Sequence, residues 1–377
     1  MQTQKTEALL PAFFPLEACV LRLRALFERR GFRRVFPSMF EDYALYLDNK
    51  NFLGAAWVLT FMDPGGRLLA IKPDVTLSIA KGVNEAELAC AEKLYYTDEV
   101  VRFSPQNGAY KVMPQIGLEW IGAQDTFANL EVVDLALRSL ALIGEESAVD
   151  ISHMAFVSGL LEDAGLSPHL ERELLSAIHA KSIHSAAALL DSAGVGAPEK
   201  ERILTLADLH GPFPKELERA KTLVRGPRME QAFKELSDLA EIIQPQAGQT
   251  VNLDFSVVHD LDYYNGLIFR GYIKGIPEVV CGGGRYDNLM KKLGKRSGAV
   301  GFAVYLHRLE GYLARYSRQT DVLITYSEPC DWKALLEKTN EFNAQGLTVR
   351  CAAQGSDISG ISHARLMRFP EGGGTDA

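Results

Sequence analysis

The chain has 377 residues, of which 47% are hydrophobic and 23% charged, so it can bury a large core and is expected to form more than one domain. Its formal net charge of −8 gives no electrostatic footprint for nucleic acid, and we therefore predict no nucleic-acid partner. No apolar run approaches the roughly 20 residues of a membrane span, and the first residues lack a signal-peptide pattern.

The amino-terminal part of the chain alternates helical and extended patterns. The predicted elements are a helix from Pro15 to Gly31, an extended segment at 32–37, a hairpin of 57–62 and 68–72, a helix at 76–81, a strand at 94–102 and a helix at about 129–143. Pro37 has no amide hydrogen to donate to a ladder, so the extended segment is expected at a sheet edge or at a contact with another chain.

The stretch 111–120 alternates strictly between apolar and polar positions. Its apolar positions are Val112, Pro114, Ile116, Leu118 and Trp120. Side chains alternate across a strand, so the pattern predicts one face in the core and one face lining something polar. Gln115 and Glu119 point the same way, with Gly117 leaving a gap between them, which suits a small ligand that bears an ammonium group. The alternative interpretation is a half-solvated outer strand.

The middle of the chain changes character. Residues from about 168 to 246 are rich in Ala, Leu, Glu and Lys and predict an insertion of several short helices. Strands are then predicted at 251–255, 263–272 and 278–281, followed by a glycine-rich turn at 282–288. This turn lacks the spacing of nucleotide-binding glycine loops. A short strand at 299–303 and a helix at 306–316 complete this part.

The chain beyond Arg318 predicts a separate unit. A strand at 321–326, a helix at 332–345 and a strand at 347–352 form a β-α-β unit, and the tail around 372–374 is predicted to be disordered. Residues 1–318 contain hairpins and helices with few β-α-β alternations, which predicts an α+β fold with an antiparallel sheet flanked by helices. The predicted domains are therefore 1–318, with the helical insertion, and a short α/β unit at 319–377.

Cysteine and histidine usage points to no metal site. The five cysteines, Cys19, Cys90, Cys281, Cys330 and Cys351, are scattered without a CxxC pair. They predict reduced thiols in a cytoplasmic protein rather than disulfides or a zinc site. The histidines of the insertion are interpreted as surface or packing residues, and no cofactor is predicted.

Several segments, in this order along the chain, resemble the catalytic core of the histidyl-tRNA synthetases, a family of class II aminoacyl-tRNA synthetases. Residues 36–41 resemble motif 1, 72–76 the Arg-Pro-Glu-Gly-Thr motif, 95–119 motif 2, 261–264 the histidine-specific signature, 282–287 the Gly-Gly-Arg-Tyr-Asp motif, and 301–303 with Arg308 motif 3. The resemblance implies a class II synthetase-like fold and a homodimer through the motif 1 region.

The resemblance also implies an amino-acid pocket. Asp74, Thr76, Gln115 and Glu119 would hold the α-ammonium group of histidine. Tyr264 and Tyr286 would bond the imidazole, which offers one donor and one acceptor when neutral. The alternative for the tyrosines is core packing with a tethered hydroxyl.

The ATP side of the site departs from the family pattern. His259 and Asp260 stand where synthetases have arginine and glycine, and imidazole is a poor substitute for a permanent guanidinium facing phosphate. Motif 2 keeps Arg102 but shortens the polar run after it, and Tyr305 replaces a motif 3 glycine. We therefore interpret Arg102, His259, Tyr305 and Arg308 as a degenerate nucleotide site, with no catalytic residue and with ligase activity lost.

A synthetase core that keeps histidine recognition without ATP activation resembles the regulatory subunits of ATP phosphoribosyltransferase. The resemblance implies a hetero-oligomer with the short, catalytic form of that enzyme in the first step of histidine biosynthesis, under feedback control by L-histidine. Two other functions stay open from the sequence. One is an active histidine–tRNA ligase, and the other is a stand-alone paralogue that binds an amino acid.

Overall fold

The computed structural model describes residues 14–48, 58–84, 91–105, 107–122, 125–258, 263–314, 320–359 and 361–369. The chain divides into two compact units. One is Arg22–Leu309, and the other joins the chain before Arg22 to the chain after Leu309. The domain boundary predicted after Arg318 lies outside the described residues.

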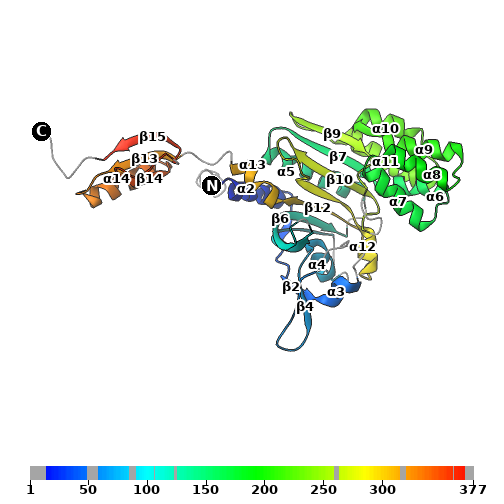
Figure 1. The fold of residues 1–377 in the computed structure, drawn as a ribbon, viewed down its shortest axis with the longest axis horizontal. Coiled ribbons are helices and arrows are strands. Elements are labelled where there is room, and N and C mark those ends of the chain that lie inside the picture. Colours follow the sequence, from blue (N-terminus) through cyan, green and yellow to red (C-terminus); the bar gives the residue numbers. More distant parts are fainter. Residues whose placement is uncertain are drawn as a thin grey trace. The chain divides into compact units, whose positions relative to one another are not determined.

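The larger unit is built on a nine-stranded sheet (Figure 1). In spatial order the strands are β1 (Arg33–Arg34), β5 (Glu92–Ser104), β6 (Ala109–Ile121), β12 (Ala299–Tyr305), β11 (Cys281–Arg285), β10 (Leu267–Ile273), β7 (Ser147–His153), β9 (Gln249–Asp254) and β8 (His210–Pro212). Neighbouring strands are antiparallel except for the β1–β5 and β7–β9 pairs. This confirms the predicted α+β fold with an antiparallel sheet, although β7 was not predicted.

Helices and a small second sheet surround these strands. The helices of this unit outside the insertion are α2 (Pro15–Arg29), which belongs to it from Arg22 on, α3 (Tyr43–Asp48), α4 (Val75–Gly82), α5 (Thr126–Ile143), α6 (Met154–Asp163), α12 (Asp287–Lys292) and η3 (Leu306–Arg308). Helix α13 (Glu310–Leu313) belongs to the other unit. Helix α5 packs across β10, β11 and β12 and so covers one face of the sheet. The two strands of the predicted hairpin are β3 (Thr60–Met62) and β4 (Leu68–Ile71). With β2 (Phe40–Asp42) they form a small sheet in the order β2-β4-β3.

The glycine-rich stretch at 282–288 is not the turn that its composition predicts. Its first residues belong to β11, which lies between β10 and β12. Glycine is usually depleted in strands, but it is used where another backbone approaches closely. A Cβ added to Gly283 would lie only 2.6 Å from the Cα of Phe302 on β12. The glycines therefore allow the strands to approach. The strand predicted at 278–281 lies at 281–285 instead.

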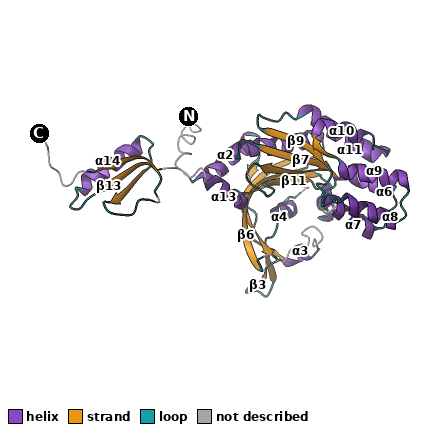
Figure 2. Ribbon diagram, turned by 45° about the horizontal axis from the view of Figure 1, so that its top comes forward, coloured by secondary structure: helices purple, strands orange, loops and turns teal. Residues whose placement is uncertain are grey.

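The segment predicted as a helical insertion folds into five helices (Figure 2). They are α7 (Pro168–His179), α8 (Ile183–Ser192), α9 (Ala197–Asp208), α10 (Phe213–Lys221) and α11 (Gly226–Ile242). Strand β8 interrupts them and pairs with β9, so the segment also supplies the last strand of the main sheet. Helix α11 packs against α6 and α5, which places it beside the helix that covers the sheet.

The carboxyl-terminal unit contains one strand more than predicted. Strands β13 (Thr320–Tyr326), β14 (Val349–Ala353) and β15 (His363–Arg368) form a parallel sheet in the order β14-β13-β15, with α14 (Trp332–Ala344). Its core includes Val322, Ile324, Leu335 and Phe342. The tail that was predicted to be disordered lies outside the described residues. Across the described parts of the whole chain, every helix is too short or too polar to span a bilayer.

Candidate functional site

Strand β6 carries the polar groups that the alternating pattern predicts. On one face, the ring of Trp120 packs edge-on against Phe127 of α5, with ring centroids 6.1 Å apart. On the other face, Gln115 and Glu119 retain only 6% and 1% of their accessible surface. The interpretation of this stretch as a half-solvated outer strand is therefore wrong over these residues, because β6 is covered on both faces.

The carboxylate of Glu119 is held by two hydroxyl groups from different elements. Thr76, on α4, donates a hydrogen bond from its hydroxyl to Oε1 at 2.6 Å. Tyr286, which precedes α12, donates from its phenol to Oε2, also at 2.6 Å. Gly301 of β12 makes room for this group, since a Cβ there would lie 2.9 Å from the carboxyl carbon of Glu119. The structure thus brings three of the predicted histidine-binding residues into direct contact.

The protonation of Glu119 follows from its surroundings. Burial raises its pKa to about 8, and the nearby charge of Asp74 acts in the same direction. The hydrogen bonds from Thr76 and Tyr286 oppose this by stabilising the ionised form. A carboxyl group with this pKa is mostly protonated at neutral pH and ionises readily when a cation arrives to pair with it.

Asp74 has a structural task besides the predicted ligand role. It is the N-cap of α4, and its Oδ1 accepts a hydrogen bond from the amide of Leu77 at 2.8 Å. Its Oδ2 lies 3.4 Å from Nη2 of Arg102, whose Nε also donates to the carbonyl of Pro73 at 2.8 Å. Arg102 of β5 is therefore fixed beside the start of α4.

Tyrosines fill the space around Glu119, and two of them were not predicted. The phenol of Tyr96 lies over Gly117, where an added Cβ would come within 2.6 Å of the ring carbon Cζ. The gap expected at Gly117 is thus filled by Tyr96. The strand register, which pairs Tyr96 with Gly117, is the signal that would have found it. The rings of Tyr263 and Tyr264 lie 4.6 Å apart, and burial raises the pKa of Tyr264 well above its usual value.

A cavity of about 320 Å³ opens beside this cluster. Its lining includes Arg102, Gln115, Tyr264, Arg270, Tyr305 and Arg308. The guanidinium of Arg308 lies 4.7 Å from the ring centroid of Tyr305 and donates to the carbonyl of Val279. The cavity thus joins two of the predicted histidine residues to three of the predicted nucleotide residues, and sequence reasoning missed Arg270. His259 and residues 260–262 of the signature lie outside the described residues.

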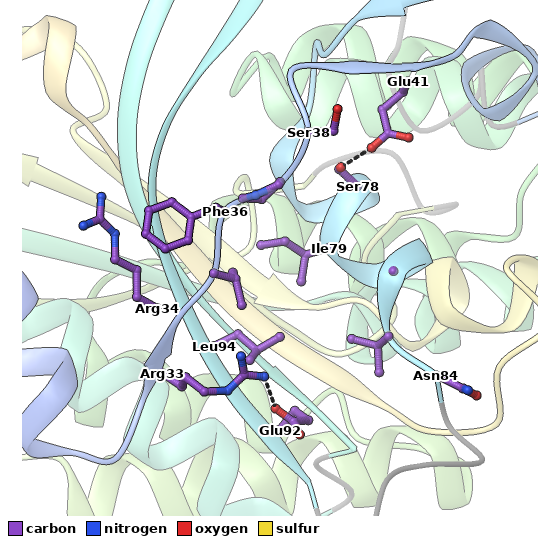
Figure 3. Close-up of a pocket in the computed structure, with 14 residues that line it drawn as sticks. Arg33, Arg34, Phe36, Ser38, Glu41, Ser78, Ile79, Asn84, Glu92 and Leu94 are labelled. Atoms are coloured by element: carbon purple, nitrogen blue, oxygen red, sulfur yellow. Dashed lines mark hydrogen bonds and ion pairs between the residues drawn. The ribbon is translucent and has the colours of Figure 1, made fainter.

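A larger cavity, of about 710 Å³, lies at the motif 1 segment (Figure 3). Ser78 donates to Glu41 at 2.5 Å on one side of it, and Arg33 pairs with Glu92 at 2.9 Å on another. The guanidinium of Arg34 lies 4.5 Å from the ring centroid of Phe36, whose exposed fraction is 77%. This segment follows β1, which ends the main sheet, in agreement with the edge position expected for Pro37.

The sequence is similar to known proteins over most of its length. The histidyl-tRNA synthetase family model matches residues 6–309. An ATP phosphoribosyltransferase regulatory subunit of Moorella thermoacetica is 30% identical over 350 residues, covering 89% of this chain and 88% of that protein. One of Geobacter metallireducens is 30% identical over 359 residues, covering 92% of this chain and 82% of that protein.

Two solved structures show the same fold. An ATP phosphoribosyltransferase regulatory subunit/histidyl-tRNA synthetase from Bacillus halodurans C has a TM-score of 0.76 at 23% identity, covering 96% of this chain and 95% of that one. A chain of the ATP phosphoribosyl transferase (HisG:HisZ) complex from Thermotoga maritima has a TM-score of 0.63 at 20% identity, covering 78% of this chain and 98% of that one.

Proposed function

Since the chain belongs to the histidyl-tRNA synthetase family and, within it, to the ATP phosphoribosyltransferase regulatory subunits, we propose that it is the non-catalytic subunit controlling the first step of histidine biosynthesis. The observation that carries the proposal is the cluster of Glu119, Thr76 and Tyr286, which keeps a buried, hydroxyl-bonded carboxyl group next to a cavity. Such a group suits an ammonium ligand, because a buried charge requires an opposite charge or hydrogen bonds.

We propose L-histidine as the ligand of this cluster. The residues that we assign to it are Asp74, Thr76, Gln115, Glu119, Tyr264 and Tyr286. Gln115 and Tyr264 line the cavity, which gives a ligand a route to the buried carboxyl group. On binding, the ammonium group would pair with ionised Glu119, and the imidazole would exchange hydrogen bonds with the phenols.

We propose that the nucleotide side no longer supports ligation. The ring of Tyr305 projects over β11, where a Cβ on Gly282 would lie 3.1 Å from its hydroxyl oxygen. Arg308 is drawn onto the face of this ring and onto the carbonyl of Val279. A guanidinium engaged in this way is less available to stabilise charge on a transferring phosphate.

We propose two protein partners. One is the catalytic short-form ATP phosphoribosyltransferase subunit, by analogy with the named complex of the structural neighbour. The other is a second copy of this chain at the motif 1 segment, where an exposed Phe36 borders the cavity of about 710 Å³. Histidine would shift such an assembly between two states through its different affinity for each of them.

The proposed compartment is the cytoplasm. Cys281 and Cys351 are thiols, which supports a reducing compartment of this kind.

The proposal is tested by reconstitution with a short-form catalytic subunit. Co-purification, activation of phosphoribosyl transfer by this chain and inhibition of the complex by histidine are the expected results. Pyrophosphate release by this chain alone, dependent on both ATP and histidine, would instead identify a ligase. Calorimetry across the amino acids separates the third possibility, since a preference for another amino acid would defeat the assignment of the pocket.

A further inference from the structure

A partly buried polar network connects the helical insertion to the residues around Glu119. It begins at Glu235 on α11, whose Oε2 lies 3.1 Å from Nε2 of His153, at the end of β7. Asn129 of α5, with 2% of its surface exposed, donates from Nδ2 to the same oxygen at 3.4 Å. Its Oδ1 accepts a hydrogen bond from Nη1 of Arg285 at 3.4 Å. Two helices, α11 and α5, and two strands, β7 and β11, are therefore joined by one chain of contacts although they are distant in sequence.

The network continues through the turn that carries Tyr286. Nε of Arg285 donates to Oδ2 of Asp287 at 2.8 Å, and Oδ1 of Asp287 accepts from the amide of Ala299 on β12 at 2.9 Å. Asn265 also holds this turn, because its Oδ1 accepts a hydrogen bond from the backbone amide of Asp287 at 2.8 Å. The residue held between Arg285 and Asp287 is Tyr286, whose phenol donates to Glu119. The orientation of this phenol thus depends on the turn.

Glu235 is ionised in this arrangement. Burial opposes its charge, but the hydrogen bond and electrostatic interaction with His153, the hydrogen bond from Gln231 and, last, the charge of Arg285 prevail and hold the pKa of Glu235 below its usual range. The carboxylate therefore attracts the guanidinium of Arg285 across Asn129. Both contacts of Asn129 exceed the usual length of an N–H···O hydrogen bond, about 2.7–3.2 Å, so this joint is the weakest in the network.

We propose that Glu235 and Asn129 are positioning residues for the ligand site: they orient Arg285, and through its turn they hold the phenol of Tyr286 on Glu119. The inference rests on the proposed function for the identity of the ligand. A ligand that pairs with Glu119 must alter its bond to Tyr286, and this change passes to the turn and to α11. By linkage, if a partner that binds α11 changes the affinity for the ligand by some factor, the ligand changes the affinity for that partner by the same factor.

The test compares Glu235→Gln with Asp238→Asn. Both variants remove one negative charge from α11 and keep the shape of the side chain, but Asp238 pairs with the exposed Lys234, at 2.7 Å, and lies outside the network. Calorimetric titration with L-histidine should show an affinity on the order of 5-fold weaker, or more, for Glu235→Gln and within 2-fold of wild type for Asp238→Asn. Glu235→Asp, which keeps the charge, should recover part of the loss. A Glu235→Gln affinity within 2-fold of wild type overturns the inference.

A second measurement, of stability in the absence of ligand, tests the network independently of histidine binding. Urea midpoints of Glu235→Gln, Tyr286→Phe and the double variant form a cycle, and the network predicts that the two shifts do not add. The same cycle with Asp238→Asn should be additive. If wild type binds no histidine, the proposed ligand is wrong, and an additive Glu235–Tyr286 cycle would then refute the network as well. The side chain of Glu235 is 20% exposed, so the isosteric variants are expected to fold.

Discussion

Replacing Glu119 with glutamine separates the ligand role of this residue from its effect on stability. In the unliganded protein burial raises the pKa of Glu119 to about 8, against 4.5 for the ordinary side chain. The folded state thus keeps a proton that the unfolded state has lost between these pH values. The stability contributed by Glu119 is therefore fully present below about pH 4.5 and is lost as the pH rises to about 8.

The size of the effect follows from this difference. The stability lost by pH 7 is the distance from pH 4.5 to pH 7 multiplied by 1.36 kcal/mol per pH unit, or roughly 3 kcal/mol. Glutamine has the same shape and does not titrate, so Glu119→Gln should raise the free energy of unfolding at pH 7 by up to this amount, and by little at pH 4.5. Histidine binding should weaken, because a charge-assisted hydrogen bond is worth about 1.5–3 kcal/mol, or about 10- to 150-fold in Kd.

Two assays check the variant. Urea unfolding across pH 4.5 to 8 gives the stability difference, and calorimetric titration with histidine gives the affinity. Glu99→Gln, at an exposed position on β5, is the control for the loss of one negative charge. A Glu119→Gln protein that is less stable than wild type at pH 7 would refute the argument from burial. An unchanged affinity would show that histidine binds elsewhere.

The other predictions concern the same cluster. The affinity of wild type for histidine should rise from pH 6 to pH 8, because the ammonium group pairs with ionised Glu119 and binding below about pH 8 releases a proton; calorimetry in buffers of different ionisation enthalpy counts it. Tyr286→Phe removes a donor to that carboxylate and should lower the free energy of unfolding by about 1–3 kcal/mol in urea at pH 9, where the group is ionised. Gly283→Ala, with a Cβ 2.6 Å from the Cα of Phe302, should cost about 3 kcal/mol or prevent folding, as judged by circular dichroism. Asp74→Ala removes the N-cap of α4 and should lower the urea midpoint by the equivalent of about 1 kcal/mol.

Local patterns predicted the parts of the fold that depend on local chemistry. The alternation around Gln115 and Glu119 predicts β6 and its buried polar face, because a period of two is decided by the strand itself. The prediction for 282–288 was wrong because glycine propensity is a local property, whereas the need for glycine in β11 comes from the neighbouring β12. Strand β15 escaped prediction because its residues are mostly exposed and its apolar positions do not alternate regularly with polar ones.

The candidate site was likewise only partly predictable from local sequence. Family resemblance assigned Thr76, Glu119 and Tyr286 to one pocket, and the structure places them in hydrogen-bond contact. Tyr96 and Arg270 were missed, because their closeness to the site arises from strand register across the sheet, and the position of Tyr96 within motif 2 does not reveal it. A pairing between distant strands must be known before such residues can be predicted.

The glycines of β11 restrict how the cavity beside them can be redesigned. Gly282 and Gly283 form part of the floor of the cavity of about 320 Å³, and a methyl group on Gly283 would collide with the adjacent strand. Gly283 therefore offers no position at which a side chain could be introduced to suit another ligand. A variant designed to bind a different ligand in this cavity is better altered at lining side chains such as Gln115, Arg270 and Tyr305, while Gly283 is kept.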